Sequence, residues 1–227
     1  MANGYHPPLE EYLETIYSLT EEGVPTIQAR IAERLGHTPQ TVSETVHKLI
    51  NEGYLKIGPQ KEIVLTDSGR NLSESIVRRH RLAERFIVDV LGLPWSQAHI
   101  EAGKWEHVIS PEVENRFREL LDYPETCPHG NPIPGTNFDT KGQRALSCLD
   151  RNSYASVARI TEQIEIDHDI LAYLEQTGIM PGRRIQLIDK TKDGTLLIKL
   201  HGSDDKEAET VMLENNLAEQ IFCYPEH

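Results

Sequence analysis

Apolar residues recur at the spacing of an α-helix in three successive segments near the N-terminus. The first segment follows Pro7-Pro8 and has an apolar face made of Leu9, Tyr12, Leu13, Ile16 and Tyr17. The second runs from the expected cap Thr26 to Gly36. The third begins with Thr38 as cap and Pro39 in its first turn, where a missing N–H breaks no helical hydrogen bond. Its buried stripe is Val42, Val46, Leu49 and Ile50. Two helices joined by a short turn that contains glycine predict a helix-turn-helix.

Two short strand-like segments come next, and three helical segments follow them. The strands, "YLKI" and "EIVLT", flank the Gly-Pro turn of "GPQK" and predict a wing. A long helical pattern then runs from Asp67 to Gly92, and "HIEAGKWEHVIS" is interpreted as a second helix. The third has Ser110 as cap and Pro111 as its first residue. Because the apolar faces of these helices have no other evident partner, we expect a helical dimerisation layer.

The last part of the chain changes from helical to strand-like spacing. A loop rich in proline and glycine, "PETCPHGNPIPGTNFDTKG", precedes the strand-like segments "SYASVARI", "RRIQLID", "TLLIKL" and "AEQIFCY". Asp193-Gly194 is the expected hairpin turn, and a short helix is expected around 167–176. The prediction is a mainly α protein with a small β part: a winged helix-turn-helix domain at 1–72, a helical dimerisation and metal-binding domain with its linker at 73–145, and a small β-barrel at 146–227.

Charge is unevenly distributed along this chain. The net charge of −13 argues against a protein that coats nucleic acid indiscriminately. Residues 34–61 nevertheless carry four basic side chains against two acidic ones, a net charge of +2, so a sequence-specific DNA-binding protein stays possible. No run of 18 apolar residues and no secretory signal is present, so we interpret the protein as cytoplasmic, with no membrane partner.

Cysteine content suggests neither a disulfide framework nor a cysteine-based zinc site. The three cysteines are widely spaced and odd in number: Cys127, Cys148 and Cys223. The segment "CPHG" could offer Cys127 and His129 to a metal ion, although two such residues in a loop are usually incidental.

Histidine and glutamate side chains are better candidates for metal binding. Glu106 and His107 project within reach of one ion on the expected helix, with Gly103 in the middle of that face. His99 lies roughly 10 Å further along the helix axis, so metal binding here implies two ions. His80 and Glu84 are four residues apart on the long helix and can also reach one ion. Taken singly, each of these pairs also fits a solvated helix face.

These segments together resemble the diphtheria-toxin-repressor family of metal-dependent transcriptional regulators over nearly the whole chain. The resemblance is carried, in order and spacing, by "ARIAERL", "VSETVHKL", "VLTDSGR", "RRHRLAERF", "WEHVIS" and "GNPIPG". It implies a dimer whose winged helix-turn-helix domains bind palindromic operators when two metal sites are filled, and a C-terminal barrel that is SH3-like.

The resemblance assigns residues to two metal sites and one anion site. His80, Glu84 and His99 match the first, ancillary site, to which Glu162 and Glu165 of "TEQIE" would add ligands. Arg81 and Asn131 match positions that hold an anion nearby. The second site, coupled to DNA binding, would use the following positions: Glu11, Glu14, Gly103, Glu106 and His107. Glu11 stands where the iron-dependent branch has methionine, and Gly103 where it has cysteine and the manganese-dependent branch has an acid, so one expected side-chain ligand is absent.

The start of the third helix is the expected DNA-reading element, because a recognition helix points its N-terminus into the major groove. The candidate contacts there are Thr38, Pro39, Gln40, Thr41 and Ser43. Gln40 is the candidate for a base contact, since a carboxamide can bond adenine bidentately. Lys48 and Lys61 are expected to meet phosphate, which orients the protein without specifying sequence. The alternative is an exposed polar cap in a fold used for protein pairing.

We therefore expect a homodimeric repressor of metal-homeostasis genes that binds palindromic operator DNA. Mn(II) is the expected ion, with Fe(II) as the alternative, and two ions are expected per subunit. No small-molecule substrate is expected. Two further classes remain open: a dinuclear metallohydrolase, in which the same ligands activate a water, and a winged-helix protein whose effector is an organic molecule. No phosphate loop or nucleophile in the sequence supports the hydrolase.

Overall fold

The computed structural model describes residues 8–201 and 210–226. Its N-terminal domain contains α1 (Pro8–Glu21), α2 (Gln28–Leu35), α3 (Pro39–Asn51), β1 (Leu55–Ile57) and β2 (Ile63–Leu65). The predicted helix-turn-helix is confirmed: Gly36 ends α2 with a left-handed φ of 64°, and the Thr38 side chain caps α3 by accepting from Thr41 N. Apolar side chains of α1, α2, α3 and the two strands form one core.

The predicted wing is also present and is tied to the helices. Strands β1 and β2 pair antiparallel, with Leu55 opposite Leu65 and Ile57 opposite Ile63. The backbone N–H of Ile63 donates to Thr26 O, between α1 and α2, at 2.8 Å. The Thr66 side chain then caps the next helix by accepting from Gly69 N.

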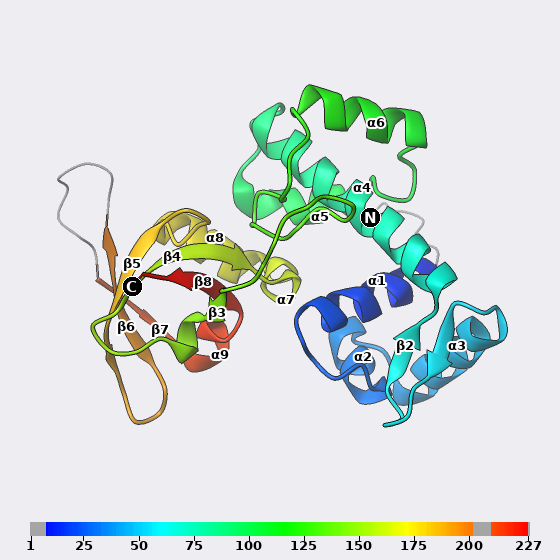
Figure 1. The fold of residues 1–227 in the computed structure, drawn as a ribbon, viewed down its shortest axis with the longest axis horizontal. Helices are drawn as coiled ribbons and strands as arrows, with labels where there is room; N and C mark the ends of the chain where they lie inside the picture. The colour runs from blue at the N-terminus through cyan, green and yellow to red at the C-terminus, as the bar shows by residue number, and fades with distance from the viewer. Residues whose placement is uncertain (1–7, 202–209, 227) are drawn as a thin grey trace.

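A single long helix joins the N-terminal domain to the helical one. Helix α4 (Asp67–Asp89) runs from beside α1 to the layer formed by α5 (Ala98–Ala102) and α6 (Pro111–Leu120) (Figure 1). The boundary predicted between 72 and 73 therefore lies inside α4. Ser110 caps α6 as predicted. None of the helices in the described residues is long and apolar enough to cross a membrane.

The helix predicted over 99–110 was wrong in its extent. Helix α5 ends at Ala102, Gly103 is its C-cap, and residues 103–108 form turns. Glycine disfavours the helical interior because it loses more backbone entropy than other residues. Trp105, which follows in the turn, packs with Phe86 of α4 and the small core of this domain, their ring centroids 6.4 Å apart.

The C-terminal domain is built on a six-stranded antiparallel sheet of order β3-β8-β4-β5-β6-β7. Its strands are β3 (Arg144–Ala145), β4 (Tyr154–Ile160), β5 (Arg184–Lys190), β6 (Leu196–His201), β7 (Thr210–Leu213) and β8 (Ile221–Pro225). Its helices are η2 (Leu146–Cys148), α7 (Glu162–Glu165), α8 (His168–Thr177) and α9 (Asn215–Ala218). All four predicted strand segments and the predicted helix α8 are confirmed.

The sheet domain is docked on the helical domain through η1 (Trp95–Gln97). Trp95 is only 4% exposed and belongs to the apolar core of the sheet domain. Glu175 of α8 accepts from the backbone N–H of Trp95 at 2.9 Å and of Ser96 at 3.2 Å. Gly130 of the linker lies so close to β4 that a Cβ there would clash with Ala158 O. This docking brings α7 against α1 and α4 (Figure 1).

Candidate metal centre

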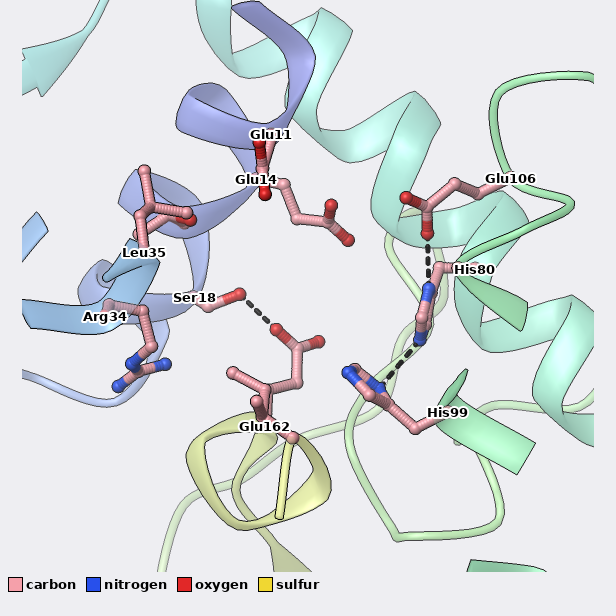
Figure 2. Close-up of a pocket in the computed structure, with 12 residues that line it drawn as sticks. Glu11, Glu14, Ser18, Arg34, Leu35, His80, His99, Glu106 and Glu162 are labelled. Atoms are coloured by element: carbon pink, nitrogen blue, oxygen red, sulfur yellow. Dashed lines mark hydrogen bonds and ion pairs between the residues drawn. The ribbon is translucent and has the colours of Figure 1, made fainter. Parts of the chain in front are cut away.

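Residues of both metal sites predicted from the sequence line one cavity between α1, α4, α5 and α7. The cavity has a volume of about 330 Å³. Figure 2 shows that His80 stands between Glu106 and His99, with Glu14 of α1 facing Glu106. The side chains that could bind a cation or an anion along its wall are Glu11, Glu14, Arg34, His80, His99, Glu106 and Glu162. An acidic wall of this kind, with imidazoles between the carboxylates, suits a divalent cation.

The first cluster combines donors from α4, α5 and α7. His80 and Glu84 share one face of α4 because they are four residues apart, with Nε2 and Oε1 3.2 Å apart. His99 Nδ1 lies 3.3 Å from Glu84 Oε1 and 3.1 Å from Glu165 Oε2. One donor atom from each of these four residues lies within 4.8 Å of the others. The structure thus brings together four of the five residues expected at the first site.

The electrostatics of this cluster fit a divalent cation. Oε2 of Glu84 is buried without a hydrogen-bond partner in the described residues, and Oε2 of Glu165 meets the imidazoles of His99 and His129. Burial disfavours a charged imidazole, but hydrogen bonds to Glu165 and Glu84 raise the pKa of His99 to about 10. Burial also raises the pKa of Glu165, with the charge of Glu84 adding to the effect. A buried carboxylate oxygen that lacks a partner is costly, and a bound metal ion would satisfy it.

Cys127 and His129 extend this cluster, although the sequence analysis interpreted them as incidental loop residues. His129 Nδ1 lies 3.4 Å from Glu84 Oε1 and 3.4 Å from Glu165 Oε2. Donor atoms of Glu84, Cys127 and His129 lie within 4.8 Å of one another, and all three residues are buried. The only signal for them in the sequence was the spacing in "CPHG", which says nothing of the distance to α4. Burial raises the pKa of the Cys127 thiol.

The second cluster is formed by Glu14, Glu106 and the other nitrogen of His80. Their donor atoms lie within 4.8 Å of one another, and His80 Nδ1 is hydrogen-bonded to Glu106. Burial, together with the charge of Glu106, raises the pKa of Glu14 to about 8. Burial would raise the pKa of Glu106 as well, but the charge of His80 and a hydrogen bond from His107 lower it to about 2. His80 therefore presents one ring nitrogen to each cluster.

The other residues expected at the second site surround this cluster. Glu11 and Gly103 line the cavity. His107 Nε2 lies 3.0 Å from Glu106 Oε1, and its Nδ1 is 2.7 Å from Glu10, a residue of α1 that was not predicted. A Cβ at Gly103 would only touch backbone oxygens at 3.6 and 3.9 Å, so a side chain fits at this position.

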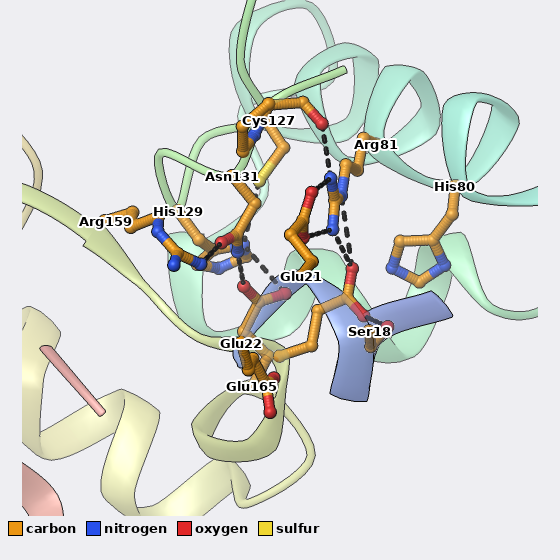
Figure 3. Close-up of polar contacts among 12 residues, drawn as sticks. Ser18, Glu21, Glu22, His80, Arg81, Cys127, His129, Asn131, Arg159 and Glu165 are labelled. Carbon is orange, nitrogen blue, oxygen red and sulfur yellow. Dashed lines mark hydrogen bonds and ion pairs between the residues drawn. The ribbon is translucent and has the colours of Figure 1, made fainter. Parts of the chain in front are cut away.

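Arg81 does not face an open anion pocket. Its guanidinium is fully buried and donates to the carboxylates of Glu21 and Glu162. Figure 3 shows Glu21 against this guanidinium. Ser18 also donates to Glu162. Burial would raise the pKa of Glu162, but the charge of Arg81 lowers it. Glu162, expected as a metal ligand, thus supplies the anion that Arg81 needs. It lies outside the groups of possible metal donors found among the described residues.

Asn131, the other residue expected at the anion site, is satisfied within the protein. Its amide group donates to Glu165 Oε1 at 2.6 Å and to Ile160 O at 2.7 Å. Arg159 donates to its Oδ1 at 3.2 Å. Asn131 therefore orients Glu165, whose other oxygen faces His99 and His129.

Nearly all the residues expected to contact DNA are exposed on the N-terminal domain. Ser43 is half-buried, and the rest are exposed: Thr38, Pro39, Gln40, Thr41, Lys48 and Lys61. Gln40 Nε2 donates to Glu44 Oε1 at 3.0 Å, one helical turn further on. A base contact from Gln40 would replace this exposed local hydrogen bond. Lys61 is at the wing turn, with a positive φ of 65°.

Three family models match the chain in succession. They are the iron dependent repressor N-terminal DNA binding domain at residues 6–63, the iron dependent repressor metal binding and dimerisation domain at 66–135, and the FeoA domain at 145–225. The iron-dependent repressor IdeR of Mycobacterium tuberculosis is 40% identical over 207 residues, covering 86% of this chain and 90% of the relative. The diphtheria toxin repressor of Corynebacterium diphtheriae is 35% identical over 218 residues, covering 90% of this chain and 96% of the relative. A solved manganese-dependent transcriptional repressor in complex with manganese has a TM-score of 0.84 at 31% identity, covering 96% of this chain and 100% of the other.

Proposed function

Because this chain belongs to the iron-dependent (diphtheria toxin) repressor family, a family of metal-dependent transcriptional repressors, we propose that it is a Mn(II)-dependent repressor. The proposed active form is a homodimer with two ions per subunit, bound to a palindromic operator that controls metal-homeostasis genes. Its fold is a winged helix-turn-helix, a helical dimerisation domain and a C-terminal SH3-like FeoA domain. The relatives are repressors and not enzymes, so the metallohydrolase alternative is set aside.

The observation that supports Mn(II) is the donor set of the second cluster. Glu14, Glu106 and His80 offer only oxygen and nitrogen, and Glu11 adds a further carboxylate on the cavity wall. No cysteine or methionine lines this cavity in the described part of the chain. Carboxylate and imidazole donors suit Mn(II) and also accept Fe(II), which is the alternative. The structural relative named for manganese and the sequence relatives named for iron leave both ions in consideration.

The two clusters would have different roles. The first would hold its ion with His80, Glu84, His99 and Glu165, with His129 and Cys127 beside it. Since Glu165 comes from the FeoA domain and the others from the helical domain, an ion there would fasten these two domains. The second would join α1, through Glu11 and Glu14, to Glu106 and His107. A bound cation would replace the proton that Glu14 holds in the metal-free protein and would bridge the carboxylates of α1 to Glu106 in the turn after α5.

This second junction is the step that links metal to DNA. Helix α1 packs on the helix-turn-helix, so fixing α1 against the helical domain also fixes the recognition helix α3 relative to the dimerisation layer. Two recognition helices of a dimer reach successive major grooves only at one separation. A metal ion that binds more tightly to the conformation with that separation raises operator affinity. The increase is limited by the difference between its affinities for the two conformations.

DNA selection followed by metal titration tests the proposal. The wild-type protein would select duplexes from a random-sequence pool in Mn(II), and binding to the selected duplex would be measured with chelator, Mn(II), or Fe(II) under anaerobic conditions. We expect a palindromic selected sequence, loss of binding in chelator and recovery in Mn(II). Operator affinity that is unchanged in excess chelator would overturn the proposal. Recovery at lower free Fe(II) than free Mn(II) would favour the iron alternative.

A pair of variants assigns the metal response to the cavity. Glu106→Gln removes a carboxylate that faces Glu14 and His80, whereas Glu101→Gln removes one that is paired with Lys104 on the surface of α5. We expect Glu106→Gln to abolish the response to Mn(II) and Glu101→Gln to keep it. Equal responses from both variants would mean that the second cluster is not the sensing site.

A further inference from the structure

Helix α1 has a polar contact with the turn that precedes α3. The Tyr12 hydroxyl lies 2.9 Å from His37 Nδ1, 25 residues further along the chain. Tyr12 is only 1% exposed, and the two rings lie against each other with centroids 5.7 Å apart. Tyr12 directly follows Glu11, which lines the metal cavity. One end of this contact therefore moves with the part of α1 that faces the cavity.

The other end of the contact lies where the recognition helix begins. His37 is in the turn between α2 and α3, after Gly36, and its backbone N–H donates to Ala32 O at 3.1 Å. Thr38 follows as the cap of α3 and accepts from Thr41 N at 3.2 Å. A displacement of His37 therefore displaces the first turn of α3, which is exposed and carries the candidate DNA contacts.

The remaining contact between α1 and this part of the chain is apolar. Both α1 and α3 contribute aliphatic side chains to the core of the N-terminal domain. Apolar packing is close to non-directional, whereas a hydrogen bond fixes the distance and direction between two atoms. No other side-chain hydrogen bond joins α1 to residues 36–51 in the described parts of the chain.

We propose that the Tyr12–His37 hydrogen bond is the link that transmits the position of α1 at the metal cavity to the N-terminus of α3. Tyr12 and His37 are then positioning residues for DNA binding, and neither needs to touch DNA or metal. The inference rests on the proposed function, since it requires that a metal ion holds α1.

The experiment is a double-mutant cycle with a matched control. Tyr12→Phe, His37→Ala and the double variant are compared with wild type for affinity to the duplex selected by wild-type protein, at saturating Mn(II) and in chelator. Tyr17→Phe is the control, because it also removes a hydroxyl from α1, and that hydroxyl has no hydrogen-bond partner among the described residues. Mn(II) affinity without DNA is measured for each variant.

We expect Tyr12→Phe to lower operator affinity in Mn(II) about fivefold, the net effect of one hydrogen bond. The ratio of affinities with and without Mn(II) should fall by the same factor, while Mn(II) affinity changes less than twofold and Tyr17→Phe matches wild type. If the hydrogen bond only stabilised the fold of the N-terminal domain, operator affinity would fall equally with and without Mn(II), and the ratio would stay unchanged. His37→Asn, which offers a polar atom near the Nδ1 position, should restore more affinity than His37→Ala.

The double variant decides whether the two residues act through each other. If they do, Tyr12→Phe has no further effect once His37 is alanine; additive losses would overturn the proposal. An unchanged Tyr12→Phe affinity would overturn it too. A loss in His37→Ala alone would assign His37 a direct DNA contact instead, because the buried Tyr12 cannot reach DNA. If wild-type protein selects no duplex, or binds it equally with and without Mn(II), the proposed function is overturned and the Tyr12–His37 link with it. If wild-type protein responds to Mn(II) but the losses are additive, only the link is overturned.

Discussion

Arg81 of α4 donates two hydrogen bonds to Glu162 of α7, from Nε at 3.1 Å and from Nη2 at 2.6 Å. Both residues are buried, and they come from the helical domain and the FeoA domain. Glu21 of α1 lies on the same guanidinium at 2.6 Å. One arginine therefore joins all three domains, and it directly follows His80, which belongs to both donor clusters.

The two glutamates of α7 are expected to differ in their effect on metal binding. Glu165→Ala removes an oxygen donor of the first cluster and should weaken binding of that ion by tenfold or more, while Glu162→Ala should leave it near wild type. Glu162→Ala should instead lower the free energy of unfolding by about 3 kcal/mol, because it leaves Arg81 buried with one carboxylate. Titration calorimetry with Mn(II) and thermal unfolding measure the two effects. A Glu162→Ala protein that loses one ion while Glu165→Ala keeps both would reverse this assignment.

Metal binding should release protons at neutral pH. The pKa of His99 is raised to about 10 and that of Glu14 to about 8, so both groups are protonated at pH 7 in the metal-free protein. Metal ligands must lose their protons, so protons compete with the ion. Raising the pH removes this competition, and apparent Mn(II) affinity should increase from pH 6 through pH 8. Calorimetry at pH 7 in two buffers of different ionisation enthalpy would detect the protons. Identical binding enthalpies in the two buffers would contradict the expectation.

Position 103 should tune metal preference. A side chain fits there without displacing backbone, since a Cβ would have only ordinary contacts with His99 O and Ile100 O. Gly103→Cys adds a soft donor to a cavity wall that offers oxygen and nitrogen, so affinity for Zn(II) and Co(II) should increase relative to Mn(II). Gly103→Ala is the control for the added Cβ and should leave the ratio unchanged. Competition binding measures the ratio. A ratio that Gly103→Cys also leaves unchanged would show that this position does not reach the ion.

Substitutions of two side chains of α3 should have different effects, one on the sequence preference for DNA and the other on overall DNA affinity. Gln40→Ala should weaken binding to the selected duplex by about 1 to 3 kcal/mol and relax preference at one base position. Lys48→Ala should weaken binding to selected and random duplexes equally and reduce the salt dependence by about one unit of slope. Fluorescence anisotropy at several salt concentrations distinguishes them. If Gln40→Ala lowers both affinities alike, the exposed hydrogen bond from Gln40 to Glu44 is its main role.

The sequence by itself determined the features that depend on neighbours along the chain. Thr38 and Ser110 cap their helices as predicted, because a cap needs only the next three residues. The predicted cap Thr26 was wrong: Ile27 precedes α2, and the Thr26 hydroxyl donates to Ile63 O of the wing instead. Apolar periodicity located the helix-turn-helix and the strands. His80 and Glu84 were correctly placed on one face of α4, since that placement follows from helical geometry. Family resemblance named the remaining candidates, but it could not supply their distances.

Only the tertiary structure decided which of these side chains meet. His129 reaches Glu84 because the linker packs back on α4, and Trp95 enters the core of the FeoA domain because the two domains dock. No local spacing encodes either contact. Glu162 is held by Arg81 and not grouped with the metal donors, because a buried guanidinium requires a carboxylate partner. His80 faces both clusters because Glu106 lies in a turn after α5 rather than on the helix that the sequence predicted. Burial and long-range packing set these choices, and both exist only once the chain has folded.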